Sequence, residues 1–158
     1  MTQTLVQILQ AHPFMAGFRP EHTTKLAALA KQVHFDPGQV IFHEGDDFSV
    51  LYLLGEGMVA LELEVPGHVM RVQTLYAGDL FDWSALLPHA GKHFQARALN
   101  RVAALAFEGE QLLASFKADP EFGLAFMLRV MGVVSERLRA TRLQLLDMYS
   151  PVAKAAGA

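Results

Sequence analysis

Residues 35–46 read Phe35-Asp36-Pro37-Gly38-Gln39-Val40-Ile41-Phe42-His43-Glu44-Gly45-Asp46. Within them, the three apolar residues Val40–Phe42 stand between Pro37-Gly38 and Gly45-Asp46. A short run of β-branched and aromatic residues between turn-forming pairs is typical of a strand with a tight connection at each end. The segment therefore predicts a β structure made of short strands.

The same pattern continues in both directions, so that residues 33–107 are expected to form one β unit. Further strands are predicted at Val50–Leu54, Met58–Val65, Val69–Leu75 and Arg101–Phe107, with glycines at 38, 45, 57 and 78 in turns that favour positive φ. Closely spaced strands of this kind predict a mainly β fold, an antiparallel jelly-roll barrel with flanking helices. Alternation in Leu61-Glu62-Leu63-Glu64-Val65 predicts that both glutamates face water.

Helices are predicted on both sides of the β unit, and residues 1–149 are expected to form a single domain. Apolar spacing indicates a helical lead-in over residues 3–32, with Pro20 suited to a first helical position. Residues 108–149 are predicted to hold a short helix, Glu110–Phe116, and a long helix that Asp119 caps and that ends near Tyr149. Residues 150–158 are expected to be a flexible tail.

The long helix carries an apolar row with alternating spacings of four and three residues. Such a row is typical of a helix seam between two copies and predicts a homodimer, with Thr141 as its one polar position. Alternatively, the row docks only on its own barrel, and a second row (Leu124, Leu128, Leu146 and Tyr149) makes other contacts. The predicted seam consists of Met127, Met131, Val134, Leu138, Thr141, Leu145 and Met148.

Composition excludes several classes of function. The chain has 158 residues, a formal charge of −3 and no cysteine, so thiolate catalysis and cysteine-bound metals are impossible. The charge also argues against non-specific nucleic-acid binding, and no apolar run is long enough for a membrane span. The start of the chain lacks the layout of a signal peptide, so we expect a cytoplasmic protein.

Catalysis is not expected from the remaining motifs. A metalloenzyme of the cupin type would share the barrel, but it needs clustered ligands, and His34, His43, His68, His89 and His93 are scattered along the chain. Four arginines of the long helix (Arg129, Arg137, Arg139 and Arg142) alternate with acidic residues and are interpreted as a solvated helix face. We therefore predict neither an enzyme nor a metal site.

Several motifs together resemble one known family. The opening segment 35–46, the strand residues 51–54, Gly57-Met58-Val59, residues 77–81 and residues 96–99 follow in the order found in cyclic-nucleotide-binding domains. The resemblance covers about residues 20–149 and is closest to the sensor domain of the catabolite activator (Crp/Fnr-type) family. It implies a β-roll with a long dimerisation helix, and a cyclic nucleotide such as cyclic AMP as the ligand. The helix-turn-helix that follows in those relatives has no counterpart here, so direct DNA binding is not expected.

The expected ligand site departs from the family pattern. In the family, this segment reads approximately Phe-Gly-Glu-Leu-Ala-Leu, and an arginine follows that neutralises the cyclic phosphate. Phe81 is aligned with the glycine, Asp82 with the glutamate and Lys92 with the arginine, although a gap would move His93 to that position. The expected phosphate-binding segment comprises Phe81, Asp82, Trp83, Ser84, Lys92, His93, Phe94 and Gln95.

Three functions remain open from the sequence. We favour a regulatory module with a degenerate pocket that binds cyclic AMP or cyclic GMP weakly or not at all and acts on an unknown protein partner. Alternatively, the pocket binds a cyclic nucleotide, or another small anion or aromatic ligand through Lys92 and Trp83. A cupin-type enzyme is the least favoured. Asp82 is also interpreted as a cap for a turn at Ser84–Leu87.

Overall fold

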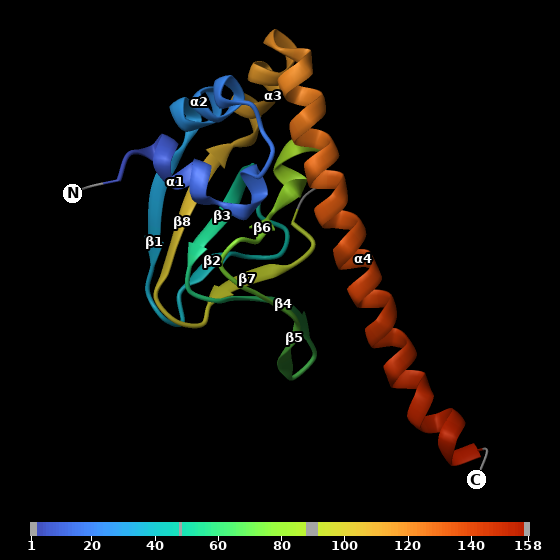
Figure 1. The fold of residues 1–158 in the computed structure, drawn as a ribbon. Coiled ribbons are helices and arrows are strands. Elements are labelled where there is room, and N and C mark those ends of the chain that lie inside the picture. The colour runs from blue at the N-terminus through green and yellow to red at the C-terminus, as the bar shows by residue number, and fades with distance from the viewer. Residues whose placement is uncertain (1–2, 48, 88–91, 157–158) are drawn as a thin grey trace.

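Two four-stranded antiparallel sheets form a β-roll in the computed structural model, which describes residues 3–47, 49–87 and 92–156 (Figure 1). One sheet has the order β1-β8-β3-β6 and the other has the order β2-β7-β4-β5. The strands are β1 (Lys31–Phe35), β2 (Val40–Phe42), β3 (Val50–Glu56), β4 (Val59–Val65), β5 (His68–Leu75), β6 (Leu80–Phe81), β7 (Gln95–Ala98) and β8 (Val102–Glu108). The predicted jelly-roll class with flanking helices is confirmed.

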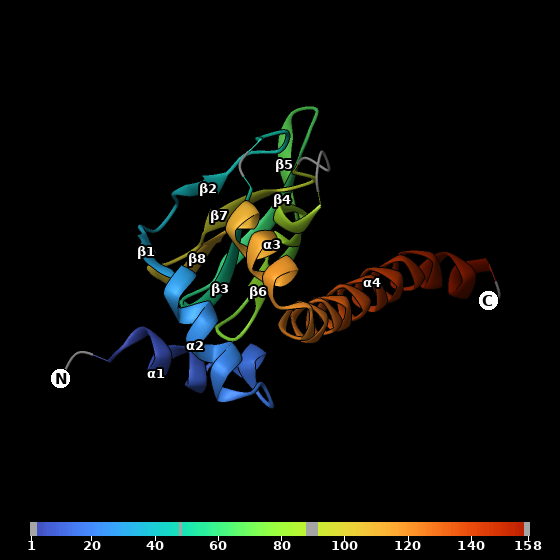
Figure 2. The same ribbon diagram turned by 90° about the horizontal axis from the view of Figure 1, so that it is seen from above.

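Helices flank the roll at both ends of the chain. The lead-in forms α1 (Leu5–Ala11), the 3-10 turn η1 (Pro13–Met15) and α2 (Pro20–Leu29); the C-terminal part forms α3 (Gly109–Ala118) and α4 (Pro120–Ala156). A second 3-10 turn, η2 (Trp83–Leu86), follows β6. Figure 2 shows that the far end of α4 runs away from the β-roll.

The caps of the helices follow from the sequence. Pro20 occupies the first turn of α2. The Asp119 carboxylate accepts a hydrogen bond from the Phe122 amide at 3.2 Å, so that α4 begins at Pro120 as predicted. However, α4 continues past the expected end at Tyr149 to Ala156, since Pro151 does not interrupt it.

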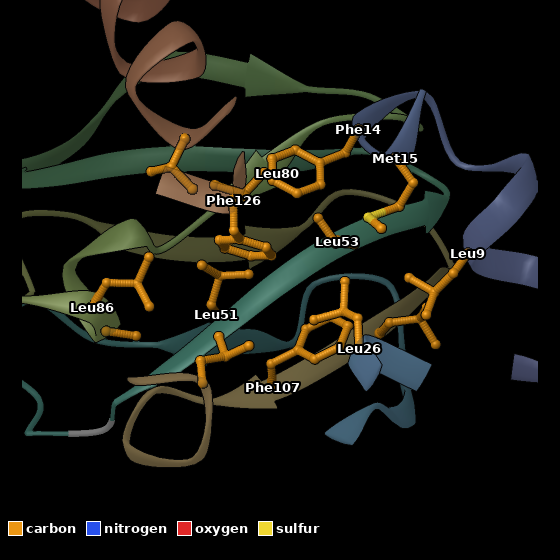
Figure 3. Packing of buried hydrophobic residues seen from close by; sticks show 14 of the residues in the cluster. Leu9, Phe14, Met15, Leu26, Leu51, Leu53, Leu80, Leu86, Phe107 and Phe126 are labelled. Carbon is orange, nitrogen blue, oxygen red and sulfur yellow. The ribbon is translucent and has the colours of Figure 1, made fainter. Parts of the chain in front are cut away.

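The larger hydrophobic cluster lies between the first sheet and the helices. Side chains of β3 (Leu51, Leu53) and Phe107 of β8 pack against the lead-in residue Leu26 and against Phe126 of α4 (Figure 3). Burying these side chains fixes the start of α4 on the roll, because each fully buried large apolar residue contributes about 1.5–3 kcal/mol. A second cluster, including Leu54, Phe81 and Val102, fills the interior between the two sheets.

The expected turn glycines have positive φ. Gly38, Gly45, Gly57 and Gly78 have φ between 83° and 98°. At Gly57 a Cβ atom would lie 2.3 Å from the carbonyl oxygen of Arg101, so this connection excludes every other residue.

The prediction that both glutamates of β4 face water is wrong for one of them. Glu64 is exposed, but Glu62 is buried. The pairing of β4 with β5 shifts register between Leu61 and Glu62. This irregularity interrupts the simple alternation of side chains, and Glu62 consequently points to partners on β7.

Candidate functional site

The predicted phosphate-binding segment begins at the end of β6. Phe81 pairs with Tyr52 of β3 in the regular sheet, and the next residue, Asp82, has φ 66° and ψ 46°. Asp82 is the only non-glycine residue with positive φ in the part of the chain that the structure describes. Because glycine adopts this conformation at the lowest cost, the backbone indicates that Asp82, and not Phe81, stands in the place of the family glycine. Trp83 then takes the place of the glutamate, one residue later than expected from the sequence.

The Asp82 carboxylate is held by two side chains. It accepts a hydrogen bond from Ser84 Oγ at 2.8 Å and forms an ion pair with the ammonium group of Lys92. The side chains of Lys92 and Asp82 are only 1% and 3% exposed, so the ion pair is sealed from bulk water. The Asp82 side chain therefore does not cap η2, contrary to the interpretation of Asp82 as a cap.

Burial dominates the electrostatics of this pair. It raises the pKa of the Asp82 carboxyl, and the Lys92 ammonium and Ser84 hydroxyl oppose this rise only in part. Burial and the charge of Asp82 also raise the pKa of Tyr52 to about 12. The Lys92 ammonium lies 4.9 Å from the centre of the Phe42 ring, a second favourable contact for a buried cation.

The cavity beside this ion pair is small. Its volume is about 40 Å³, and Asp82, Trp83, Ser84, His93 and Phe94 contribute to its walls. Pockets that bind drug-sized molecules have volumes from about 300 Å³ upward, whereas one water molecule takes about 30 Å³ of the liquid. The cavity in this conformation consequently has room for water or a very small ion, and not for a nucleotide.

Aromatic rings pack behind the site, in the core between the two sheets. Phe81 is fully buried, and its ring stacks on Tyr52 with 4.9 Å between the centroids and 14° between the planes. The Phe81 ring also stacks against Phe42 at 6.4 Å. Phe81, which we expected in the phosphate-binding segment, thus has a structural role, because its ring is part of the core and does not line the cavity.

A second polar group lies on the other sheet, on strands β4 and β7. The buried Glu62 carboxylate accepts hydrogen bonds from Gln95 Nε2 at 3.1 Å and from Arg97 Nε at 3.0 Å. Arg97 also donates to the carbonyl oxygen of Gly38 at 3.0 Å. Gln95, which we expected in the phosphate-binding segment, therefore binds Glu62 and does not line the cavity.

Two arginines of α4 are not solvated, contrary to the sequence interpretation. Arg129 donates to the carbonyl oxygens of Phe14, at 2.7 Å, and of Ala16, and thereby holds the lead-in. Arg137 is buried, donates to the carbonyl oxygen of Leu80 and lies over the Trp83 ring at 4.6 Å. Both lie on the side of α4 that faces the roll, because they follow Phe122, Phe126 and Val130 at helical spacing.

The structure thus brings together most of the predicted site residues. Asp82, Trp83, Ser84, His93 and Phe94 surround one small space, and Lys92 joins them through its ion pair with Asp82, whereas Phe81 and Gln95 face other partners. Sequence reasoning missed Arg137 and Phe42, which complete the walls. The residue spacing on the long helix could have identified Arg137, because Arg137 continues the row of residues that face the roll. His89, together with residues 88 and 90–91, lies outside the described residues.

Within the described residues, no group of three or more histidine, cysteine or acidic side chains stands close enough to hold a metal ion. A search of the described helices found none with the length and hydropathy that a membrane crossing requires.

Comparisons with known proteins agree with this architecture. The cyclic nucleotide-binding domain family matches residues 32–119, more than half of the chain, and the chain belongs to this family. The chain is 26% identical over 143 residues to the "Cyclic AMP receptor protein" of Thermus thermophilus, a match that covers 90% of this chain and 64% of the relative. The chain therefore spans less than two thirds of the length of that curated relative.

Solved structures give the same result. The Thermus thermophilus catabolite activator protein superposes with a TM-score of 0.70 and 27% identity, covering 87% of this chain and 63% of the other. A protein of Geobacter metallireducens GS-15, described as cyclic nucleotide-binding, superposes with a TM-score of 0.75 and 26% identity, covering 87% and 99% of the two chains. These similarities place the chain among sensor domains of the catabolite activator type.

Proposed function

We propose that this chain is a non-catalytic regulatory module whose nucleotide pocket is filled by its own ion pair, and that it acts through protein–protein contact. The observation that carries the proposal is the buried pairing of Lys92 with Asp82 beside a cavity of about 40 Å³. In this arrangement the Asp82 carboxylate serves as an internal substitute for a ligand anion. The lysine that would neutralise a phosphate is already neutralised.

The energetic cost of displacing the pair supports weak nucleotide binding. A ligand phosphate that recruits Lys92 leaves the Asp82 carboxylate buried and unpaired, which costs on the order of 3–5 kcal/mol. Since each 1.4 kcal/mol is a tenfold change in affinity, this cost alone weakens binding by about two to three and a half orders of magnitude. The Trp83 and Phe94 side chains must also move to enlarge the cavity.

The polar groups of the site bind one another through a hydrogen bond and an ion pair, which supports a non-catalytic role. Ser84 donates its hydroxyl hydrogen to Asp82, but the Asp82 carboxylate is ion-paired with Lys92 and only 3% exposed, so it offers a substrate no accessible base.

We further propose that α4 forms a homodimer with a second copy of the chain. Leu124 and Leu128 are largely exposed, and each follows a buried phenylalanine by two residues, which corresponds to about 200° around the helix. The apolar face that contains these leucines therefore points away from the roll, and another protein surface is needed to bury it. Within the predicted seam, Met131, Leu138 and Met148 are the most exposed members, whereas Val134 packs partly against its own core. Thr141 donates to the carbonyl oxygen of Arg137 within its own helix.

Calorimetry with cyclic AMP and cyclic GMP tests the filled pocket. We expect no binding by the unaltered protein at ligand concentrations up to roughly 1 mM, an affinity limit near −4 kcal/mol. Asp82→Gly relieves the positive φ and frees the Lys92 ammonium, so this variant should gain measurable binding that Asp82→Gly/Lys92→Ala loses again. Thermal unfolding of each variant confirms that the protein remains folded.

Two results would contradict the proposal. Micromolar binding by the unaltered protein that Lys92→Ala abolishes would replace it with the cyclic-nucleotide sensor that the family resemblance implies. If Asp82→Gly folds but stays silent, then the aromatic side chains and not the ion pair close the pocket, and the role assigned to Asp82 is wrong.

Sedimentation equilibrium tests the dimer. Leu138 is 68% exposed on the apolar face, and Leu138→Asp should give monomers because two carboxylates would be buried at the seam. Leu143 is also exposed but belongs to neither apolar row, so Leu143→Asp is the matched control and should stay dimeric. A dimeric Leu138→Asp protein would rule out this face as the interface.

A further inference from the structure

Arg137 is a buried cation whose hydrogen-bonding capacity is only partly used. The residue is 9% exposed, and Nη2 donates to the carbonyl oxygen of Leu80. Its guanidinium lies over the indole ring of Trp83. Nη1 is sealed from solvent and has no acceptor within residues 3–47, 49–87 and 92–156.

An unpartnered donor in this position is costly. Leaving a buried hydrogen-bonding group unsatisfied costs about 1–3 kcal/mol, and more when the group is charged. Burial lowers the pKa of Arg137 to about 10, so the guanidinium remains cationic at neutral pH. The residue therefore favours an acceptor that carries negative charge.

The two spaces that Arg137 adjoins differ in their charges. On one side, a cleft of about 380 Å³ contains the carboxylates of Asp79 and Glu136, which offset the charges of Arg129 and Arg137 there and leave the cleft without net positive charge. On the other side, the cavity of about 40 Å³ contains Ser84 and opens beside the exposed His93, and its only carboxylate, Asp82, is neutralised by Lys92. An anion is consequently favoured on the side of the small cavity.

We propose that this cavity binds a small carboxylate, which supplies the missing acceptor for Arg137 and fastens α4 to the β-roll. The proposal rests on the filled pocket described above, because the Lys92–Asp82 pair must stay intact for the cavity to remain small and free of net negative charge. The size of the cavity restricts the ligand to a few heavy atoms, such as formate or acetate. Because Nη1 is sealed behind its neighbours, the ligand reaches it only when the Trp83 indole shifts.

Occupancy of this site would act on the dimerisation helix. Arg137 is adjacent in sequence to Leu138, which lies on the exposed apolar face of α4. Its hydrogen bond to Leu80 connects the helix to the strand that leads into the site. A carboxylate at Arg137 therefore stabilises the docked position of α4 and the orientation of the face that it presents.

Trp83 is the only tryptophan of the chain, and its fluorescence reports on the site directly. We expect sodium formate and sodium acetate to change Trp83 fluorescence saturably and to raise the unfolding temperature, relative to sodium chloride at the same ionic strength. Arg137→Gln should weaken this response at least about tenfold, since it removes the charged donor. Arg139→Gln is the matched control: Arg139 is 70% exposed and follows Arg137 by two residues, about 200° around the helix, so its loss should leave the response unchanged.

A wild-type protein that gives no saturable response to either carboxylate would overturn the proposal, as would an equal response from a folded Arg137→Gln variant. If Arg137→Gln fails to fold, Arg137→Lys keeps the charge without the planar fork and should respond more weakly than the unaltered protein. A missing carboxylate response in a protein that also fails to bind cyclic AMP would overturn this site alone, whereas binding of cyclic AMP would overturn the proposed function and, because it displaces the Lys92–Asp82 pair, this site as well.

Discussion

The rings of Phe81 and Tyr52 lie nearly parallel, 4.9 Å apart between centroids, at the point where strands β6 and β3 pair. This contact joins the segment that leads into the site to the central strand of the first sheet. It keeps the backbone in position immediately before the left-handed residue Asp82.

Phe81→Ala should destabilise the protein by about 3–5 kcal/mol, because the side chain is fully buried and leaves a cavity between the sheets. Urea denaturation measures the loss. Phe35, which is only partly buried and meets Tyr52 edge-on at 6.1 Å, provides the comparison, and Phe35→Ala should cost less. Equal losses for the two variants would argue against the stacking of Phe81 as the main support of this segment.

Removal of one partner of the Lys92–Asp82 ion pair should destabilise the protein more than removal of both partners. Lys92→Met leaves the Asp82 carboxylate buried without a cation and should cost about 3–5 kcal/mol at pH 8, whereas Lys92→Met/Asp82→Asn should cost clearly less. Chemical denaturation of the single and double variants tests this double-mutant cycle. Additive losses would mean that the two charges do not interact.

The stability of the Lys92→Met variant should depend on pH differently from that of the unaltered protein. Without Lys92, only the Ser84 hydroxyl opposes the effect of burial, and the pKa of Asp82 in the folded state lies above the ordinary value of 3.8. At Asp82 the folded state then binds more protons than the unfolded state, so the free energy of unfolding of Lys92→Met should rise relative to that of the unaltered protein as the pH falls from 8 toward 5. Stability that instead falls in parallel with that of the unaltered protein would contradict the assignment of a buried carboxylate.

His12 should make the lead-in sensitive to acid. Its Nδ1 accepts from the Phe14 amide at 3.2 Å and its Nε2 donates to the carbonyl oxygen of Leu54 at 2.9 Å, an arrangement that only the neutral ring satisfies. Burial lowers its pKa from the ordinary value of 6.5, although the Leu54 carbonyl and Asp79 oppose this effect. The unfolded state therefore takes up the proton first, and stability is lost as the pH falls below about 6.5.

Denaturation at pH 8 and pH 5 measures this loss in the unaltered protein and in His12→Gln, whose pH dependence should be smaller. The exposed His34 gives the matched control, and His34→Gln should keep the original dependence. An unchanged slope for His12→Gln would assign the acid sensitivity to other groups.

Glu62 and Glu64 lie on the same strand but should differ sharply on substitution. Glu62→Ala leaves Gln95 Nε2 and Arg97 Nε without their acceptor and should cost about 1–3 kcal/mol. Glu64→Ala changes an exposed position and should stay within about 0.5 kcal/mol of the unaltered protein. Thermal unfolding distinguishes them, and similar effects from both substitutions would contradict the buried role of Glu62.

Local sequence signals were enough to predict the β-roll, the turn glycines, the cap of α4 and the stretch of chain that forms the site. These features depend on local rules: turn residues set φ, apolar spacing sets the strand or helix period, and Asp119 with Pro120 starts a helix. The family resemblance rested on the same local motifs, and the matched residues 32–119 support it.

The pairing of the polar residues, in contrast, depends on how distant segments meet in the folded protein. Lys92 meets Asp82 across a loop, Gln95 and Arg97 reach Glu62 from another strand, and Arg137 comes from a helix that begins far along the chain. These partners are far apart in sequence, and their choice depends on sheet register and on the angle at which α4 packs. The register shift that buries Glu62 and the left-handed backbone at Asp82 leave no periodic signal, because each is set by the groups that surround it in the folded protein.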